Sequence, residues 1–405
     1  MLCQYTVKNF KSIREEVTLD MQATSISEHE DRIFAEADGE KFLPVAAIYG
    51  PNGGGKSNLL ASLYTLRAKI VRPILTMRSE SQKFEVPGVT PFLFTKEERP
   101  TEFEIFFRTK VAEYKYYLAL QKEKVVKEAL SQRKFENRKI SELFYRDENG
   151  VELKGDLAKL TATEISSTLP LLSYLGILYG ENGIISDVIN WFRSSLYVMN
   201  YGNYTLEQRL LKLTGSDDED FKELRLKMLK EMDIDIEDFR IEKIDDGSRR
   251  RIYTTHTVDG LDTELEISEE SSGTRKVFSI ITFVIDSLLT GSTLVVDELD
   301  AKLHPCLLKY LIGLYTDLKV NKFGAQLIFT SHDLTTMNSD VFRRDEIWFV
   351  AKGNKQDSQM YSLVEFKMGD KKVRKDARFD KQYLEGKYGA DPYLKKIIDW
   401  ENVNV

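Results

Sequence analysis

The sequence of 405 residues is poor in the residues from which covalent and metal frameworks are built. It contains two cysteines, Cys3 and Cys306, and four histidines. So few cysteines exclude a disulfide framework of the kind that holds small secreted domains, and they argue against a zinc cluster. We therefore expect a protein of a reducing compartment and assign it to the cytoplasm.

An excess of positive charge is also missing. The chain has 58 basic residues against 65 acidic ones, a net charge of -7, which argues against an overall cationic nucleic-acid binder but is compatible with a local basic face. Hydrophobic residues make up 42% and charged residues 30%, which is typical of a globular protein. The length predicts two cores, or one large core with an insertion.

Long hydrophobic runs are scarce as well. The first 21 residues alternate apolar and polar side chains and have no signal-peptide core. Residues 277–296, VFSIITFVIDSLLTGSTLVV, form the most apolar stretch, but Asp286 and the polar segment TGST interrupt it and two acids follow it. We interpret this stretch as a buried helix followed by a buried strand, and expect no membrane span.

The remaining pattern predicts an α/β fold with a mixed sheet, an antiparallel β subdomain and a mostly helical insertion. Predicted strands include CQYTVKNF, TEFEIFFRT, EYKYYLALQ and RRIYTTHTV, which alternate, and LPVAAIYG, STLVVDE and AQLIFTS, which are continuously apolar. Helical spacing within residues 183–199 and 218–232 predicts the insertion. We expect residues 1–120 and 246–366 to form the two halves of the main α/β domain, 121–245 to form the insertion and 367–405 to form a basic helical tail.

One glycine-rich segment carries the clearest chemical signal. Residues 50–57, GPNGGGKS, match G-x-x-x-x-G-K-[ST] between a predicted buried strand and a predicted helix. Glycines let successive N–H groups point at phosphate oxygens, and the helix adds the positive end of its dipole. Lys56 would reach the β- and γ-phosphates, and the Ser57 hydroxyl would ligate Mg²⁺. A plain glycine turn is the alternative, which the order strand, loop, helix disfavours. The residues that we expect to hold the nucleotide in this segment are Asn52, Gly53, Gly54, Gly55, Lys56, Ser57 and Asn58.

Two acids follow an apolar strand in the segment LVVDE. Asp297 is placed to hold Mg²⁺, and Glu298 is placed to orient or deprotonate an attacking water. By itself this pattern equally describes a strand that ends in two solvated acids. Together with a phosphate-binding loop it favours a catalytic metal site.

Two further segments are ambiguous by themselves. ESSGTRK, residues 270–276, opens an apolar helix, where Ser271 or Ser272 would cap the helix and Gly273 would allow close approach to an anion. Read alone, it is an ordinary helix start. TSHD ends a buried strand with His332, and a lone histidine there is more often a satisfied edge residue than a catalytic one.

Read in order with ELDAKLHP, these segments resemble the ATP-binding cassette (ABC) superfamily of P-loop NTPases, in its SMC/RecF/OLD-like soluble branch. The resemblance implies heads that pack head-to-tail as a homodimer or higher oligomer, with each ATP between the P-loop of one head and the signature of another. It implies that Ser271 and Gly273 touch the γ-phosphate of the partner's ATP, that Asp300 is the dimer-loop acid and that His332 is the switch histidine. VKNFKSIRE resembles the family's opening strand pair, in which a basic residue, here Lys11, lies near the nucleotide.

The chain further resembles a bacterial subfamily of these ATPases from phage-defence and abortive-infection operons. The segments that carry this resemblance are ESSGTRK, DELDAKLHP, TSHD, RRDEIWFV and YLEGKYGADP. That resemblance implies an ATPase switch that acts beside a separately encoded nuclease, of TOPRIM type or another. The alternatives are a RecF/SMC-like repair ATPase that clamps DNA directly and a transporter ATPase. The transporter is disfavoured because residues 90–107, where the family's metal-binding glutamine belongs, contain no Gln.

The basic tail leaves two interpretations open. Its sequence, from Phe366 to Lys396, has the composition of a solvated helix face or of a contact for nucleic acid or a partner protein. We find no acidic cluster after Glu298 that resembles a nuclease metal site, so a nuclease activity would belong to a separate protein.

Overall fold

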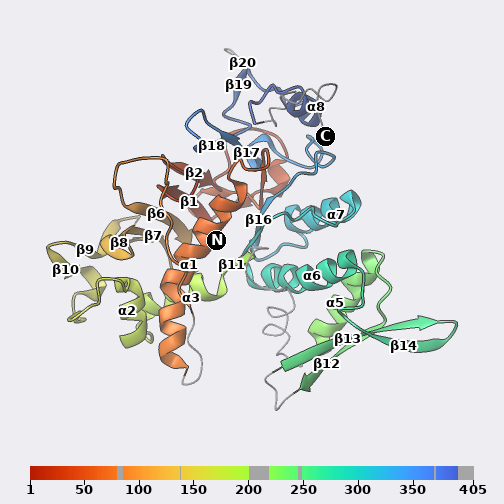
Figure 1. Ribbon diagram of the computed structural model, residues 1–405, viewed down its shortest axis with the longest axis horizontal. Helices are drawn as coiled ribbons and strands as arrows, with labels where there is room; N and C mark the ends of the chain where they lie inside the picture. The colour runs from red at the N-terminus through yellow and green to blue at the C-terminus, as the bar shows by residue number, and fades with distance from the viewer. Residues whose placement is uncertain (80–84, 137, 200–218, 245–248, 369–370, 391–405) are drawn as a thin grey trace, which may run out of the picture.

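The chain folds around two large β-sheets and one smaller sheet (Figure 1). This computed structural model describes residues 1–79, 85–136, 138–199, 219–244, 249–368 and 371–390. The predicted α/β fold with an antiparallel β subdomain is confirmed.

The first large sheet is antiparallel. Its strands are β1 (Leu2–Lys8), β2 (Val17–Asp20), β6 (Thr101–Arg108), β7 (Ala112–Gln121), β8 (Lys124–Lys134), β9 (Ile140–Asp147) and β10 (Gly150–Leu153). They lie in the order β10-β9-β8-β7-β6-β1-β2. Side chains alternate between buried and half-buried, clearly in β6, because only one face of the sheet packs against the core.

The second large sheet is parallel apart from one edge strand. It consists of β5 (Val45–Tyr49), β11 (Leu196–Met199), β15 (Thr293–Val296), β16 (Gln326–Thr330), β17 (Ile347–Lys352) and β18 (Ser358–Ser362). Their order is β11-β15-β16-β5-β17-β18, with β18 antiparallel to β17. Every residue of β5, β15 and β16 is buried, because both faces of this sheet are covered.

The helices and minor strands complete the architecture. The α-helices are α1 (Lys56–Arg78), α2 (Leu171–Leu178), α3 (Gly183–Ser194), α5 (Glu219–Glu231), α6 (Ser272–Thr290), α7 (Pro305–Thr316) and α8 (Phe379–Leu384). The small antiparallel sheet is made of β12 (Asp238–Ile244), β13 (Arg249–Val258) and β14 (Leu261–Glu266). Short pieces are β3 (Phe34–Ala35), β4 (Lys41–Phe42), β19 (Lys367–Met368), β20 (Lys371–Lys372) and the 3₁₀ turns Glu30–Arg32, Gly155–Leu157 and Arg344–Glu346.

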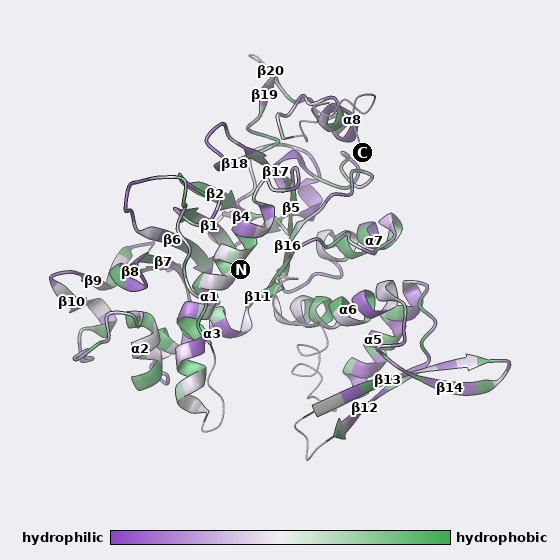
Figure 2. Ribbon diagram, viewed as in Figure 1, coloured by the Kyte–Doolittle hydropathy of each residue, from purple (hydrophilic) through white to green (hydrophobic). Residues whose placement is uncertain are grey.

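Two hydrophobic cores lie on opposite faces of the parallel sheet. In β5, Ala46 and Ile48 join the first core, which α1, α2, α3 and the antiparallel sheet complete. Val45, Ala47 and Tyr49 join the second core, together with α5, α6 and α7. Most of α6 is hydrophobic in Figure 2, as expected for a helix that packs against the sheet. The parallel sheet is therefore the middle layer of the molecule.

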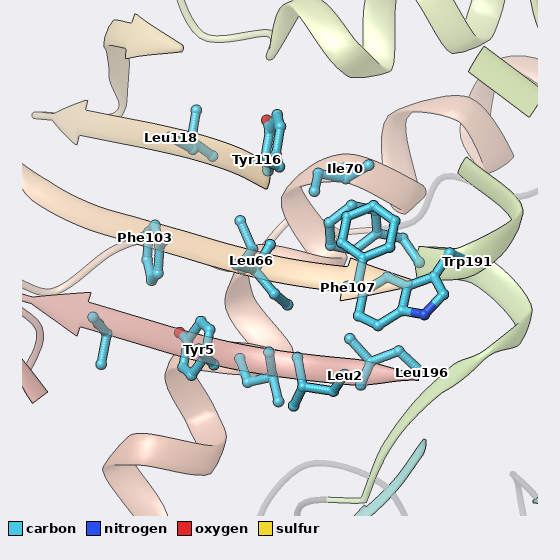
Figure 3. Packing of buried hydrophobic residues seen from close by; sticks show 14 of the residues in the cluster. Leu2, Tyr5, Leu66, Ile70, Phe103, Phe107, Tyr116, Leu118, Trp191 and Leu196 are labelled. Carbon is cyan, nitrogen blue, oxygen red and sulfur yellow. The ribbon is translucent and has the colours of Figure 1, made fainter. Parts of the chain in front are cut away.

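Aromatic packing dominates the first core (Figure 3). The ring of Phe107 in β6 stacks on that of Trp191 in α3, with 4.1 Å between centroids. Leu2, Leu66 and Leu196 lie around this pair and come from β1, α1 and β11. The core thus joins segments that are almost 200 residues apart in the sequence.

A buried amide connects the two large sheets. Gln326 at the start of β16 accepts a hydrogen bond from the Leu2 backbone N–H at 2.7 Å, and its Nε2 donates to the carbonyls of Leu2 and Leu43. Thr293 of β15 donates to the same Gln326 oxygen at 3.1 Å. Because buried polar atoms are costly without partners, this set of bonds fixes β1 against the start of β16.

The segment 121–245 contains more strands than the sequence predicted. Strands β8, β9 and β10 continue the antiparallel sheet to residue 153, so about the first quarter of this segment is not a helical insertion. Residues 183–199, predicted as one helix, form α3 and then strand β11, which pairs with β15. The helical part is therefore smaller than the sequence predicted. The segment TGSDDED at 214–220, whose composition predicts an acidic turn, lies largely outside the described residues.

The tail also differs from the predicted basic helix. In its described part, the only α-helix is the six-residue α8, and it follows the short pair β19–β20. Tyr383 and Tyr388 are buried in the second core, and both rings stack on Phe349 of β17. This part of the tail is thus a constituent of the fold, because its aromatic residues cover the last parallel strand.

The apolar stretch 277–296 is a buried helix followed by a buried strand, as the sequence predicted. It forms most of α6 and, after a short turn, strand β15. Among the residues that the structure describes, no helix is both long enough and apolar enough to cross a membrane.

We expect the tail to contribute directly to stability. Tyr388 is fully buried, and its centroid lies 5.0 Å from that of Phe349, so Tyr388→Ala should lower the free energy of unfolding by about 3–5 kcal/mol. Leu384 is 70% exposed, and Leu384→Ala is the control, expected to change it by less than about 0.5 kcal/mol. Urea unfolding of both variants measures the difference, and equal stability of the two would contradict this account of the tail.

Candidate functional site

The site begins where three neighbouring parallel strands end. β15, β16 and β5 are adjacent, with Val296 opposite Phe329 and Thr330 opposite Ile48. The segments that follow these strands therefore leave the sheet at the same edge, where ligands of open parallel sheets bind. They are the glycine-rich loop 50–55, the acidic segment 297–300 and the segment 331–333.

The glycine-rich loop packs too closely for side chains at two positions. A Cβ on Gly50 would lie 2.2 Å from the Val350 carbonyl oxygen, and one on Gly55 would lie 2.0 Å from Ser358 Oγ. Gly55 also has φ 112°, a conformation that favours glycine. As the N-cap of α1, Gly55 offers no side chain, so the first N–H groups of the helix have no side-chain cap. Such a loop fits a phosphate group.

Side chains from three segments support this loop. Ser358 Oγ lies 2.6 Å from the Gly54 carbonyl oxygen and 2.8 Å from Ser12 Oγ. Asn58, which the sequence placed at the nucleotide, donates from Nδ2 to Ser12 Oγ at 2.7 Å. Sequence reasoning missed Ser12 and Ser358, because Ser12 is 46 residues from Asn58, Ser358 is 304 residues from Gly54, and no local pattern marks them.

Lys56 is buried inside the loop. Its ammonium donates to the carbonyls of Gly50 at 2.7 Å and Pro51 at 3.3 Å. Burial lowers the pKa of Lys56, while the negative charges of Asp297, Glu298 and Asp300 act in the opposite direction. The structure therefore brings together the lysine and the acids that the sequence predicted. Asn52, Gly53 and Ser57 are exposed at the same loop, available to a ligand.

A threonine that the sequence did not single out holds the two adjacent acids. Thr330, the last residue of β16, donates to Asp297 Oδ1 at 2.6 Å, and its hydroxyl oxygen accepts the Glu298 backbone N–H at 2.7 Å. Asp297 is buried, whereas Glu298 is exposed with φ 50°, an uncommon conformation for a residue other than glycine. Thr330 thus fixes one carboxylate and the backbone of the next residue.

A buried lysine holds the acidic segment from the other side. Lys276 in α6 donates from Nζ to the carbonyls of Glu298 at 2.7 Å and Ala301 at 2.6 Å. Burial lowers the pKa of Lys276 to about 8. Lys276 is the last residue of the segment ESSGTRK, and no local sequence pattern distinguishes it from a surface lysine. Its contact makes the start of α6 and the acidic segment one unit.

Asp300 and His332 lie together at this edge. Asp300 Oδ2 accepts the His332 backbone N–H at 2.9 Å, while Asp300 Oδ1 is buried and accepts no hydrogen bond from the described residues. Burial and then the positive charge of Lys56 lower the pKa of His332, so its imidazole is uncharged at neutral pH. Both residues therefore lie close enough to Lys56 to interact with its charge.

Ser271 and Gly273, at the start of α6, lie close to the residues that follow the acidic segment. The Ser271 hydroxyl oxygen caps α6 by accepting the Thr274 N–H at 3.0 Å. A Cβ on Gly273 would lie 3.2 Å from the Lys302 carbonyl oxygen. Within the described chain, no hydrogen bond joins Ser271 or Gly273 to the loop 50–57.

The turn that contains Lys11 lies next to the glycine-rich loop. Lys11 has φ 48° and directly precedes Ser12, which contacts Asn58. Its backbone N–H donates to the Thr90 carbonyl at 2.8 Å, and Phe92 N–H donates to the Asn9 side chain. Residues 90–100, which lack the expected glutamine, therefore pack behind this turn.

The donor set fits Mg²⁺ only together with phosphate oxygens. Among the described residues, no group of three or more His, Cys, Asp and Glu side chains could hold a metal. Asp297 and Ser57 offer one carboxylate and one hydroxyl, and Mg²⁺ is commonly held by one or two carboxylates plus the phosphates of a substrate. Asp297 and Ser57 are suited to hold the metal, and the glycine-rich loop is suited to hold the phosphates.

The fold and this arrangement define a P-loop type of ATPase domain. Residues 45–338 match the family described as "AAA domain, putative AbiEii toxin, Type IV TA system". This match covers more than half of the chain and includes both the glycine-rich loop and the acidic segment. The chain belongs to this family.

The solved structures that align with this chain include SMC heads. The SMC head domain from Thermotoga maritima aligns with a TM-score of 0.40 and 14% identity, over 89% of this chain and 98% of that one. An Smc head bound to the C-terminal winged-helix domain of ScpA has a TM-score of 0.40, 13% identity and coverages of 89% and 97%. An Smc head with an extended coiled coil, bound to the C-terminal domain of ScpA derived from Pyrococcus furiosus, has a TM-score of 0.40, 13% identity and coverages of 89% and 96%. No curated protein sequence matches the chain.

We expect the Thr330 hydroxyl to make a measurable contribution to the free energy of unfolding. Thr330→Val removes the donor to Asp297 and the acceptor of Glu298 N–H, so it should lower the free energy of unfolding by about 1–3 kcal/mol. Thr330→Ser keeps the hydroxyl and should recover most of this loss. Urea unfolding of the two variants separates them, and equal losses would show that the hydroxyl is unimportant.

Proposed function

We propose that this chain is an ATP-hydrolysing switch whose catalytic sites are shared between two copies. The observation that carries the proposal is the convergence of Lys56 with Asp297, Glu298, Asp300 and His332 at one edge of the parallel sheet. A buried lysine inside a glycine loop, beside a buried carboxylate and an exposed one, is the combination that nucleotide hydrolysis requires.

In this proposal the loop binds the phosphates of ATP. Lys56 now donates to the loop's own carbonyls, and its ammonium would turn to the β- and γ-phosphates. Ser57 and Asp297 would hold Mg²⁺, which neutralises phosphate charge when bound. Thr330 keeps Asp297 in place, because its hydroxyl donates to one carboxylate oxygen and leaves the other to the metal shell.

Glu298 is the proposed group that orients the attacking water. Its carboxylate is exposed, while its backbone is held by Thr330 at the N–H and by Lys276 at the carbonyl. A water held by this carboxylate would lose its proton to it as the water oxygen attacks the γ-phosphorus, and the bond from that phosphorus to the bridging oxygen would break to release ADP and phosphate. His332, uncharged and next to Asp300, would donate or accept a hydrogen bond without adding charge.

Ser271 and Gly273 are proposed to complete the site of a second copy. Support comes from their place, because they flank the acidic segment and yet form no hydrogen bond with the loop 50–57 in the described chain. Gly273 has no side chain, and with the first turn of α6 it would approach a phosphate closely. Asp300 Oδ1 is buried and accepts no hydrogen bond from the described residues, and the charge of Asp300 acts to raise the pKa of both Lys56 and Lys276.

We propose an anti-phage role for this switch, in which ATP-driven pairing controls a separately encoded nuclease in the cytoplasm. Support comes from the family description, which names an AbiEii toxin, and from the motifs that resemble ATPases of abortive-infection operons. Clamping of DNA by the paired heads is the alternative from the sequence. DNA binding that weakens steeply with salt would favour that alternative.

Glu298→Gln tests the hydrolytic role. The amide preserves size and leaves Asp297 free to act with the metal, so ATP binding should stay within about twofold. Loss of the proton acceptor should slow hydrolysis by about 10²–10⁴-fold. Equilibrium ATP titration and phosphate release measure the two quantities. Hydrolysis at the wild-type rate would remove Glu298 from the mechanism.

Mixing two inactive variants tests the shared site. Lys56→Ala should lose ATP binding, whereas Ser271→Arg with Gly273→Asp should keep it and lose hydrolysis. In a mixed pair, one site has an intact loop from one copy and intact Ser271 and Gly273 from the other, so the mixture should regain ATPase activity. If the Ser271/Gly273 variant alone hydrolyses ATP normally, or if mixed pairs form and stay inactive, the sites are not shared as proposed.

A further inference from the structure

A buried carboxylate stands directly before the helix start at Ser271. Glu270 Oε1 accepts hydrogen bonds from Thr254 Oγ1 at 2.6 Å and from His256 Nε2 at 2.7 Å. The Glu270 side chain is 8% exposed and that of His256 is 25% exposed, so the contact is largely shielded from water. Both donors belong to strand β13. The first turn of α6 is therefore attached to the small sheet.

The small sheet projects from the body of the molecule (Figure 1). β12 pairs with β13 only as far as Thr255, whereas the β13–β14 pairing continues to Val258 and Leu261. The outer part is thus a two-stranded arm, and its tip exposes both of these apolar side chains. His256 lies just beyond the last β12 pair, where the arm begins.

The start of α6 is held from two sides. On one side Glu270 bonds to β13, and on the other Lys276 bonds to the carbonyls of Glu298 and Ala301. Ser271 and Gly273 lie between these anchors. Their position relative to the acidic segment is therefore set by both anchors, and the loss of one anchor would free one end of the turn.

The charge of Glu270 gives this anchor a second effect. A carboxylate one residue before a phosphate-binding serine would repel the phosphate if it turned toward the ligand. Its two hydrogen bonds hold it on the opposite side, against β13. The anchor thus fixes the backbone of the turn and keeps a negative charge away from the place where phosphate would bind.

We propose that Glu270 is a positioning residue for the shared ATP site: through Thr254 and His256 it holds Ser271 and Gly273 where they meet the phosphate bound by a second copy. This inference rests on the proposed function. It also makes β13 a structural connection between the projecting arm and the ATP site.

The test uses the mixed pair described above, in which each chain contributes one half of the working site. Glu270→Ala is placed either in the Lys56→Ala chain, which contributes Ser271 and Gly273, or in the Ser271→Arg/Gly273→Asp chain, which contributes the loop. We expect at least a tenfold loss of ATPase activity in the first arrangement. In the second arrangement we expect a change of less than twofold. There Glu270 precedes the substituted Ser271 and Gly273, which do not contribute to the working site.

Conservative and matched variants separate positioning from stability. In the first arrangement, Glu270→Gln keeps an acceptor oxygen and should recover most of the activity. Glu264→Ala removes a glutamate of β14 that pairs with Arg240 at 2.7 Å on the same small sheet, and it should have little effect. His256→Ala removes one of the two donors and should give a smaller loss, again only in the first arrangement. It serves as the probe if Glu270→Ala does not fold.

Each alternative outcome has a distinct meaning. Equal losses in both arrangements, or no loss in either, would overturn the positioning role while the shared site stands. The same holds if Glu264→Ala is as harmful as Glu270→Ala. A mixture without any change at Glu270 that forms pairs but stays inactive would instead refute the shared site, and with it the inference. Native thermal unfolding and single-chain ATP binding confirm that the variants are folded.

Discussion

The backbone pairing of β15, β16 and β5 is the constraint on which the rest of the site depends. Parallel strands in this register must end together, so the segments after Tyr49, Val296 and Thr330 leave the sheet at one edge. A shift of one residue in any strand would turn buried side chains to the opposite core and move the attached segment. The two cores, one on each face of the sheet, therefore protect the register and the chemistry at the same time.

Buried polar groups then set the details that backbone pairing leaves open. Thr330, Lys276 and Ser358 each reach across to a loop from a different element, and each is largely buried. Such groups are costly without partners, so the folded state strongly prefers the arrangement in which all of their bonds are made. This explains how the exposed Glu298 can keep a left-handed backbone conformation. The surrounding bonds determine it more firmly than its local preference does.

The electrostatics of the edge connect the fold to the proposed reaction. Asp297, Glu298 and Asp300 place negative charge near Lys56, and this would oppose the binding of phosphates. One lysine cannot offset both these acids and a triphosphate. The arrangement is therefore suited to a nucleotide that arrives with a divalent cation, and to a second copy that adds N–H groups rather than further acids.

The sequence by itself determined the parts of the protein whose chemistry is local. A buried strand, a glycine loop, Lys56 and a helix follow one another within residues 45–78, and Asp297 and Glu298 directly follow an apolar strand, so both patterns could be recognised without a fold. The alternation of β6 and β7 and the apolar run of α6 were predictable for the same reason. The tertiary structure decided everything that depends on partners distant in the chain. The four apolar residues 196–199 are compatible with helix or strand by sequence alone, and they form strand β11 because they pair with β15. The aromatic residues of the tail are buried because they stack on Phe349, which is distant in the chain. The supports Thr330, Ser358 and Glu270 act through hydrogen bonds to other elements, and a side chain's hydrogen-bond partner is fixed only when the chain has folded.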